Sequence, residues 1–249
     1  EREEMRGALK SKRWFTNLSI VVISSISLRL IFPAAAVGTA LWVESKNFGL
    51  FNIVEIPLLI SGLISFIILD FVIWLEHVAS HKIPILWRIH RMHHSDNGFD
   101  VTTALRFHPL EIVLSMFWKA LIILLLGAPA IAVLIFEIIL NGMAMFKHSN
   151  VKLPLKLDKL MRKFFVTPDM HRVHHSSEHY ETDSNYGFNL SIWDQIFSTY
   201  TAQPQKGHFD MQIGLKEYRG SYSSGILWVL LLPFRKKILK LFSHDGVLG

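Results

Sequence analysis

Histidines at metal-ligand spacing are the residues of this sequence that are equipped for chemistry. The chain has 13 histidines among 249 residues, and nine of them fall into four groups: an i, i+4 pair, two H-x-x-H-H triplets and a single residue. Residues three or four positions apart share one face of a helix, so each group presents its imidazoles in one direction. The nine are His77, His81, His90, His93, His94, His148, His171, His174 and His175.

Nine converging imidazoles predict two bound metal ions. Neutral imidazole binds a divalent metal through one ring nitrogen, and its second N–H needs a fixed acceptor. Since one metal takes about four to six ligands, nine exceed a single site. The chain has no cysteine, which excludes thiolate zinc sites, iron–sulfur clusters and disulfides. Spacing alone does not select the metal, because an all-imidazole site also accepts zinc, nickel or copper.

Long apolar runs must position these histidines. They cover residues 18–43, 51–75, 110–126 and 128–146, and a membrane-spanning helix needs roughly 20 apolar residues. The last two runs are slightly short and joined by a tight turn. A hairpin that only dips into the membrane is therefore an alternative interpretation of these two runs. The first run follows Lys12 and Arg13 as a signal peptide would, but it continues past the small residues at 34–36 and is interpreted as an anchor.

The basic residues predict the orientation of these spans. Of the 26 Lys and Arg, five lie in residues 1–13 and fourteen after residue 146, whereas the loop between the first two runs holds only Lys46. Basic loops stay on the cytoplasmic side, so both termini and every grouped histidine are expected there, at a bacterial inner membrane. The net charge of +6 then reflects anionic headgroups and not nucleic acid.

The expected fold is an all-α integral membrane protein, with four transmembrane helices in two hairpins and a cytoplasmic helical cap that carries the histidines. The whole chain, 1–249, is expected to form one domain, with an amphipathic helix on the headgroups at 225–242. Lone charges inside a membrane are costly. Lys119 and Glu137 stand at similar depth in the second hairpin, so they are expected to pair.

Around the histidines, the motifs resemble those of the fatty acid hydroxylase/sterol desaturase superfamily, integral membrane di-iron oxygenases, and in particular its short bacterial members. The resemblance covers about residues 60–205. It rests on Asp70 with His77-x-x-x-His81, Trp87-Arg88-x-His90-Arg91-x-His93-His94, Thr103-x-x-Arg106-Phe107-His108-Pro109-x-Glu111, Asn141 to His148-Ser149-Asn150, Thr167-Pro168-Asp169-x-His171-Arg172-x-His174-His175, and Asn185-Tyr186-Gly187 to Trp193-Asp194.

The resemblance implies two irons held by the nine histidines, and hydroxylation or desaturation of a membrane lipid with O2. Electrons would come from an external cytochrome b5-, ferredoxin- or rubredoxin-like donor, docked on basic residues such as Lys156, Lys159, Arg162, Lys163 and Arg172. Relatives use about one further histidine, and three candidates for that place stay open: His108, His179 and a water held by Asn141. The candidate acceptors for imidazole N–H groups are Asp70, Asp183, Asn185 and Asp194.

Two other function classes also fit clustered histidines near membrane helices. A metal transporter or sensor places ligands along a pathway at the midplane, whereas these histidines lie at one end of the spans. A metallohydrolase needs an acid–base carboxylate inside a box such as H-E-x-x-H, and His77-Val-Ala-Ser-His81 has none, although Glu76 is adjacent.

Overall fold

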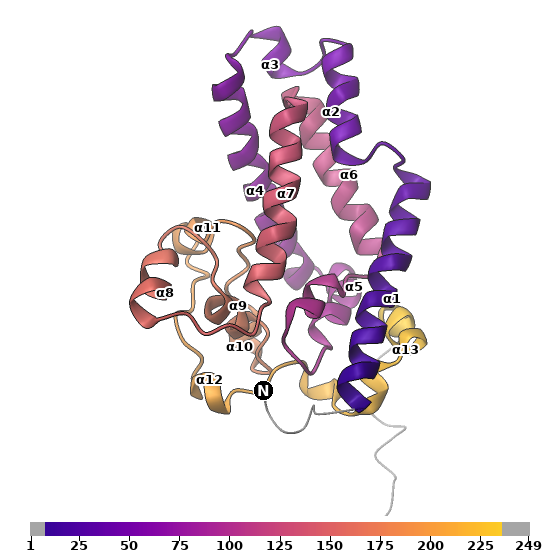
Figure 1. The fold of residues 1–249 in the computed structure, drawn as a ribbon, viewed down its shortest axis with the longest axis vertical. Coiled ribbons are helices and arrows are strands. Elements are labelled where there is room, and N and C mark those ends of the chain that lie inside the picture. The colour runs from indigo at the N-terminus through magenta and orange to yellow at the C-terminus, as the bar shows by residue number, and fades with distance from the viewer. Residues whose placement is uncertain (1–7, 236–249) are drawn as a thin grey trace, which may run out of the picture.

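The computed structural model describes residues 8–235, and within them the chain is helical with no β-strand. The longer helices come first, interrupted by the short α3, and short helices follow (Figure 1). The α-helices are α1 Ala8–Ile31, α2 Ala35–Ser45, α3 Leu50–Ile53, α4 Leu58–Lys82, α5 Pro84–His94, α6 Pro109–Leu126, α7 Ala130–Lys147, α8 Leu155–Met161, α9 Pro168–His174, α10 His179–Thr182, α11 Ile192–Ile196, α12 Gly207–Asp210 and α13 Ile226–Leu231. The 3₁₀ turns are η2 Val101–Leu105, η3 Lys216–Tyr218, η4 Ser221–Ser224 and η5 Leu232–Phe234.

Four segments are long and apolar enough to cross a membrane: Lys10–Ile53, Leu58–Lys82, Pro109–Leu126 and Ala130–Lys147. An 18-residue helix is about 27 Å long, close to the thickness of the hydrocarbon layer. Large apolar side chains cover the outside of these helices; Leu59 is 74% exposed and Ile138 is 63% exposed. In Figure 1, α2, α4, α6 and α7 form the upper part of the molecule, and α1 runs down to the lower end. The predicted integral membrane fold is confirmed.

The first two spans differ from the apolar runs. The first run is two helices, because Pro33 lacks the N–H that would continue α1 and Ala35 adopts a positive φ of 51°. The second span begins at Leu58, after the short α3 and Pro57, and continues to Lys82. His77 and His81 therefore lie within the last turns of α4 itself, and not on a separate segment beyond the span.

The upper half has a tightly packed core. Helix α2 packs against α6 and α7, and α4 packs against both of them. Small residues such as Ala36 and Ala40 face this core and allow the helices to approach closely. At the turn between α6 and α7, Gly127 has a φ of 68°, and a Cβ on Gly49 would overlap the Gly127 backbone, whereas a Cβ on Gly127 would overlap the carbonyl oxygen of Phe48. The two hairpin ends are thereby locked together at one end of the bundle.

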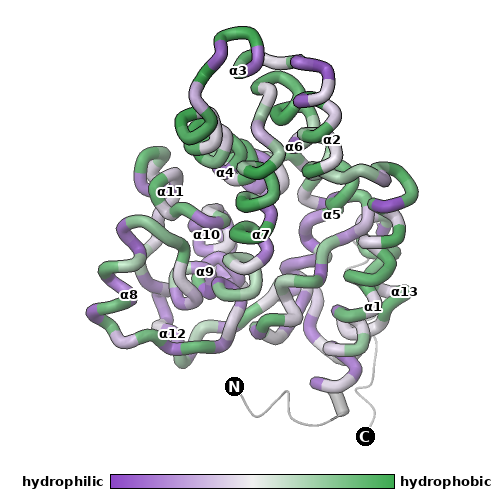
Figure 2. The backbone as a smooth tube through the Cα atoms, turned by 45° about the horizontal axis from the view of Figure 1, so that its top comes forward, coloured by the Kyte–Doolittle hydropathy of each residue, from purple (hydrophilic) through white to green (hydrophobic). Residues whose placement is uncertain are grey.

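The lower half is a cap of short helices and loops with a polar interior, visible as the purple α9 and α10 region in Figure 2. Arg106 is fully buried there. Its guanidinium donates to Asn17 Oδ1, to Ser95 Oγ and to the carbonyls of Met92 and Ser223. A buried charged side chain with a hydrogen bond at every guanidinium nitrogen fixes relative position more than it adds stability. This residue therefore ties α1, α5 and the C-terminal segment together.

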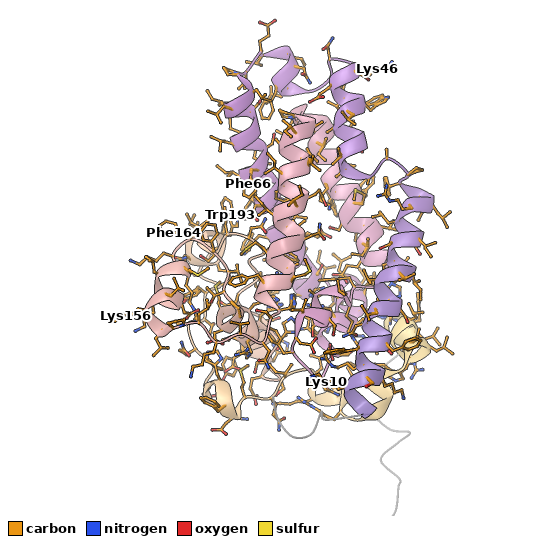
Figure 3. The ribbon with its side chains drawn as sticks, viewed as in Figure 1. Lys10, Lys46, Phe66, Lys156, Phe164 and Trp193 are labelled. Atoms are coloured by element: carbon orange, nitrogen blue, oxygen red, sulfur yellow. The ribbon has the colours of Figure 1, made fainter. Side chains whose placement is uncertain are left out.

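Lysines mark the two ends of the molecule. Lys10 and Lys156 lie at the end that carries the cap, and Lys46 lies at the opposite end (Figure 3).

The helix predicted over 225–242 is only partly described. Residues 226–231 form α13, and Pro233 lies in the 3₁₀ turn η5 that follows it. Residues 236–242 lie outside the described residues.

Candidate metal centre

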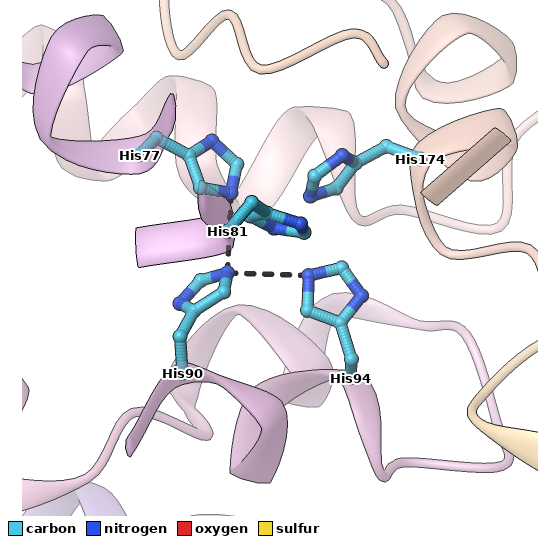
Figure 4. Close-up of side chains that lie close together, drawn as sticks. All are labelled: His77, His81, His90, His94 and His174. Carbon is cyan, nitrogen blue, oxygen red and sulfur yellow. Dashed lines mark hydrogen bonds between the residues drawn. The ribbon is translucent and has the colours of Figure 1, made fainter. Parts of the chain in front are cut away.

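The nine grouped histidines meet in two buried clusters where α4, α5, α7 and α9 converge. In each cluster the ring nitrogens available as ligands lie within 4.8 Å of one another. Cluster A consists of His77, His81, His90, His94 and His174 (Figure 4). Cluster B consists of His93, His148, His171 and His175.

The two H-x-x-H-H triplets contribute to both clusters in a complementary way. In the first triplet the i, i+4 pair His90 and His94 points into cluster A, and His93 points into cluster B. In the second triplet the i, i+4 pair His171 and His175 points into cluster B, and His174 crosses to cluster A. Neighbouring residues on a helix diverge by about 100°, so a pair of adjacent histidines can serve two sites. Each triplet therefore links the two clusters, and α4 and the end of α7 complete them.

Backbone carbonyls of one loop fix two imidazoles of cluster A. His77 Nδ1 donates to the carbonyl of Tyr186 at 2.6 Å, and His174 Nδ1 donates to the carbonyl of Ser184 at 2.7 Å. Because a carbonyl only accepts, both rings carry their proton on Nδ1. Their Nε2 lone pairs are left for the centre of the cluster.

Carboxylates fix two more rings. His90 Nδ1 lies 2.5 Å from Glu111 Oε1, and His81 Nδ1 lies 3.3 Å from Asp183 Oδ1. An acceptor on the second nitrogen sets the tautomer and raises the basicity of a ligating imidazole.

Cluster B is less fully supported. His148 Nδ1 donates to the carbonyl of Ala144 at 2.7 Å. Within the described residues, the buried Nδ1 atoms of His93, His171 and His175 have no hydrogen-bond partner.

Distances between the rings fit bound cations and not hydrogen bonds. His77 Nε2 and His90 Nε2 are 3.2 Å apart, although both rings use their Nδ1 proton elsewhere. Two lone pairs then face each other, which is repulsive unless a cation lies between them. Two nitrogens bound at right angles to one metal at about 2.1 Å would lie about 3.0 Å apart.

The same spacing occurs in cluster B. His148 Nε2 lies 3.0 Å from His171 Nε2, 3.2 Å from His93 Nε2 and 3.2 Å from His175 Nε2. His148 thus stands at the middle of its cluster. The donor chemistry and spacing of both clusters fit a metal ion.

Burial keeps these rings in the neutral form that metals require. It is the main reason why the pKa values of His93, His94, His174 and His175 fall well below the ordinary value, and neighbouring imidazoles lower them further. Burial, and next Lys147, lowers the pKa of His148 to about 3. The imidazoles of both clusters are therefore in the form that binds cations at neutral pH.

Of the four predicted acceptors, one contacts an imidazole and three bond to other parts of the chain. Asp183 contacts His81, as expected. Asp194 instead accepts from the backbone N–H groups of Tyr186 and Gly187, and so shapes the loop that holds His77.

The other two also act on the backbone of the cap. Asp70 accepts from the N–H groups of Asn189 and Leu190 and from the Trp193 indole, which fastens the loop to α4. Asn185 has a positive φ of 53° and bonds to the backbone of Met170 and Thr201. These contacts go to the chain and not to an imidazole.

The three candidates for a further ligand lie outside both clusters. His108 is the N-cap of α6, where its Nδ1 accepts from Leu110 N–H, and its Nε2 contacts the carbonyl of Leu230. The His179 side chain is 91% exposed and lies beside Asp183. Asn141 donates to the carbonyl of Glu137, one turn back on its own helix.

Lys119 and Glu137 lie side by side between α6 and α7. Lys119 Nζ is 2.6 Å from Glu137 Oε1, and the lysine is buried. The two charges therefore offset each other within the span.

A cavity of about 460 Å³ adjoins cluster A inside the helical bundle. His77 and His90 line the end beside cluster A, and Lys119 and Glu137 line it further along α6 and α7. Apolar side chains such as Ile73, Met116 and Leu140 make up much of the rest. Its size is within the range of roughly 300–1,000 Å³ that is common for small-molecule sites.

Sequence reasoning missed several supporting groups. Glu111 was noted only as part of a motif, although its place in the first turn after His108-Pro109 brings it to His90. The carbonyls that hold His77, His148 and His174 could not be found from sequence, because every residue has a carbonyl.

Comparisons with known proteins agree with this geometry. The family model described as fatty acid hydroxylase matches residues 62–199, more than half of the chain. An ornithine lipid hydroxylase of Rhizobium tropici is 31% identical over 73% of this chain and 52% of its own length. Alkylglycerol monooxygenase of Homo sapiens is 30% identical over 77% of this chain and 41% of its own length. The chain thus spans about half or less of these relatives, and no solved structure gives a significant match.

Both clusters, from His77 to His175, fall inside the matched region. The chain belongs to the fatty acid hydroxylase family.

Proposed function

We propose that this protein is a di-iron monooxygenase that hydroxylates a C–H bond of a membrane lipid. The observation that carries the proposal is the pair of clusters, one of five and one of four imidazoles, the first of which adjoins a cavity within the membrane-spanning helices. The relatives named as lipid hydroxylases and monooxygenases support the same reaction class. Iron, when bound in both clusters, would supply O2 activation; zinc could replace it in a purified sample.

The protein's own part in this reaction is positioning. Hydroxylation of one lipid C–H bond consumes one O2, two electrons and two protons, and it yields the alcohol and one water. The cavity places the lipid next to His77 and His90, which line its end, and its apolar walls exclude bulk water. Carbonyls and carboxylates on the outer nitrogens keep the rings oriented towards the centre of the cluster.

Electrons must reach the centre from a separate carrier of the cytochrome b5, ferredoxin or rubredoxin type. Two residues of the predicted basic docking surface are already engaged: Arg162 is buried against Asp158, and Arg172 pairs with Asp169. The exposed lysines near α8 are the remaining candidates for this contact: Lys156, Lys159 and Lys163.

We place the cap and both metals on the cytoplasmic side of a bacterial inner membrane, with the whole chain as one domain. Support comes from the basic residues at the cap end and from Lys46 at the opposite end.

The test is anaerobic iron loading of the purified full chain, followed by O2 and reductant in a lipid extract. We expect two irons per chain, O2 consumption that depends on lipid, and a lipid product that has gained one oxygen atom by mass spectrometry. The His93→Ala variant should lose the activity, while His179→Ala, which changes an exposed histidine outside both clusters, should keep it. One iron per chain, or a His93→Ala variant as active as the wild type, would contradict the proposal.

A further inference from the structure

The cap carries an exposed apolar surface that the metal centre does not use. Its large side chains come from two segments: Leu157, Leu160 and Phe164 from the first, and Ile192, Ile196 and Phe197 from the second. We propose that this surface, called the cap platform, is immersed in the lipid bilayer beside the span α4. Such contact with the membrane would hold whatever reaction the metal centre performs.

Backbone hydrogen bonds join the two segments into one surface. The N–H of Ser191 donates to the carbonyl of Phe164 at 3.0 Å, and the N–H of Val166 donates to the carbonyl of Asn189 at 3.0 Å. Ser191 Oγ also donates to the carbonyl of Arg162 at 2.7 Å. Helix α11 is therefore fixed beside the end of α8, and the apolar side chains of both face outwards together.

Helix α11 is attached to α4 by aromatic contacts. The Trp193 indole donates to Asp70 Oδ2 at 2.8 Å, and its ring centroid lies 5.0 Å from that of Phe71. The Phe197 ring stacks on Trp74 with the centroids 4.7 Å apart. The cap platform is thus continuous with the outer face of a membrane-spanning helix.

The position of these contacts along α4 indicates their depth. Helix α4 begins at Leu58, at the end of the bundle that lies away from the cap. Since a span uses roughly 20 residues to cross the hydrocarbon, the part of α4 inside it extends to about His77. Phe71 and Trp74 come before that point. Helix α11 therefore contacts α4 within the thickness expected for the hydrocarbon layer.

Helix α7 indicates the same depth. Its 18 residues, Ala130–Lys147, are just long enough to cross the layer, so Lys147 marks the edge on the side of the cap. Lys147 Nζ donates to the carbonyl of Gly187 at 3.2 Å, and the carbonyl of the preceding Tyr186 accepts from His77. The end of α7 thus lies near His77. The α4 residues that contact α11 lie about one to two helical turns inside that edge.

The side chains of the cap platform suit a membrane interface. In α8, Leu157 and Leu160 are three positions apart, as are Lys156 and Lys159, so the two pairs form neighbouring rows on the exposed face. Apolar side chains in such a helix enter the acyl boundary, and the lysine ammonium groups stay among the phosphates.

The order of labelled side chains in Figure 3 agrees with this placement. Trp193 and Phe164 lie between Phe66 of α4 and Lys156 on the same side of the molecule. A large exposed apolar patch marks a contact surface, and continuity with α4 identifies the bilayer as the partner. An electron carrier that docks on the lysines of α8 would then approach along the membrane surface.

The experiment measures which solvent surrounds the cap platform. Because the sequence has no cysteine, a single introduced cysteine can carry a spin label. The full chain is held in nanodiscs of phosphatidylcholine and phosphatidylglycerol. Power-saturation EPR then measures collisions of the label with O2, which concentrates in hydrocarbon, and with a polar nickel chelate, which stays in water. At Leu160→Cys and Ile196→Cys we expect the ratio of O2 to nickel collisions to be several-fold higher than at a water-exposed site.

Two reference sites calibrate the ratio. Leu59→Cys labels a 74% exposed residue of the span α4 and gives the value for lipid. His179→Cys labels a 91% exposed side chain of the cap and gives the value for water. Unchanged circular dichroism and elution volume verify that each variant is folded.

Ratios at Leu160→Cys and Ile196→Cys near the Leu59→Cys value would support immersion. Ratios equal to that of His179→Cys would overturn it, because the cap platform would then face water. Protection from both reagents would also overturn it, since a protein surface or a second copy of the chain would then cover these residues. The measurement needs no turnover, so its result is independent of whether the protein oxidises a lipid.

Discussion

Clusters A and B are built from the same residue type, yet they differ in number and in support. Cluster A has five imidazoles, and protein acceptors hold the outer nitrogens of four of them. Cluster B has four imidazoles, and within the described residues only His148 has such an acceptor. Cluster A also adjoins the cavity through His77 and His90.

With a metal in each cluster, as proposed above, this difference predicts separate tasks for the two metals. A site with an extra ligand and fixed rings holds its metal firmly and in one geometry. A site with four ligands and loosely supported rings binds more weakly and keeps more room for exchangeable ligands. We therefore expect the metal in cluster A to be retained next to the substrate, and the metal in cluster B to be lost first.

The largest expected effect comes from removing one ligand in each cluster. His148→Ala takes the central ring from cluster B and leaves three donors, so metal content should fall from two to about one per chain. His174→Ala leaves four donors in cluster A, so content should stay nearer two. Elemental mass spectrometry of desalted protein measures both.

Activity should fall by more than about 100-fold in both variants, because a ligand matters at least as much as the groups that orient it. His179→Ala is the control for the loss of an imidazole. If the two variants lost equal amounts of metal, the contrast between the clusters would be disproved.

The next effect tests the carboxylates that hold cluster A. Glu111→Gln weakens the short 2.5 Å contact with His90, so metal affinity of cluster A should fall by about 10–100-fold. Asp183→Asn affects a longer 3.3 Å contact with His81, so its effect should be smaller, below about tenfold. Competition with a fluorescent chelator gives both affinities.

A larger loss of metal affinity in Asp183→Asn than in Glu111→Gln would contradict this prediction. It would show that the length of the carboxylate–imidazole contact does not determine how much the carboxylate contributes to metal binding. Asp183 also pairs with the exposed Lys82. For this reason Lys82→Ala serves as the control for the loss of that surface pair.

The smallest expected effect is a difference between the two clusters in the rate of metal loss from the wild-type protein. Excess chelator should remove metal in two phases, with cluster B emptied several-fold faster than cluster A. The fast phase should be missing from His148→Ala, whose cluster B is already empty. A single phase in the wild type would mean that the fifth ligand and the fixed rings of cluster A add no retention.

Much of the bundle could be predicted because hydropathy is local. The predicted runs 110–126 and 128–146 agree within two residues with α6 and α7. The first two spans were less accurate, since hydropathy does not register the helix break at Pro33 or the short α3 before Pro57. Such breaks depend on backbone hydrogen bonding and not on apolarity.

The histidines of the site could be predicted from the sequence, but their assignment to the two clusters could not. Spacing identified nine histidines, and the structure gathers all nine into two clusters. Spacing did not show that His93 and His94 diverge into different clusters. That outcome depends on where α9 docks against α5, which is a contact between residues about eighty positions apart. The acceptors Tyr186 and Ser184 were hidden for the same reason.

The sequence by itself determined the residue type of the site, the number of grouped histidines and the extent of the last two apolar helices, because these follow from residue identity and local periodicity. Only the tertiary structure decided which rings share a cluster, which oxygens hold them, and which carboxylates face the cavity. The physical reason is that each of these properties needs two segments remote in sequence to meet. Glu76 illustrates this: in the sequence it is only an acid next to His77, and the packing of α4 against α6 places it with Glu111 in the lining of the cavity.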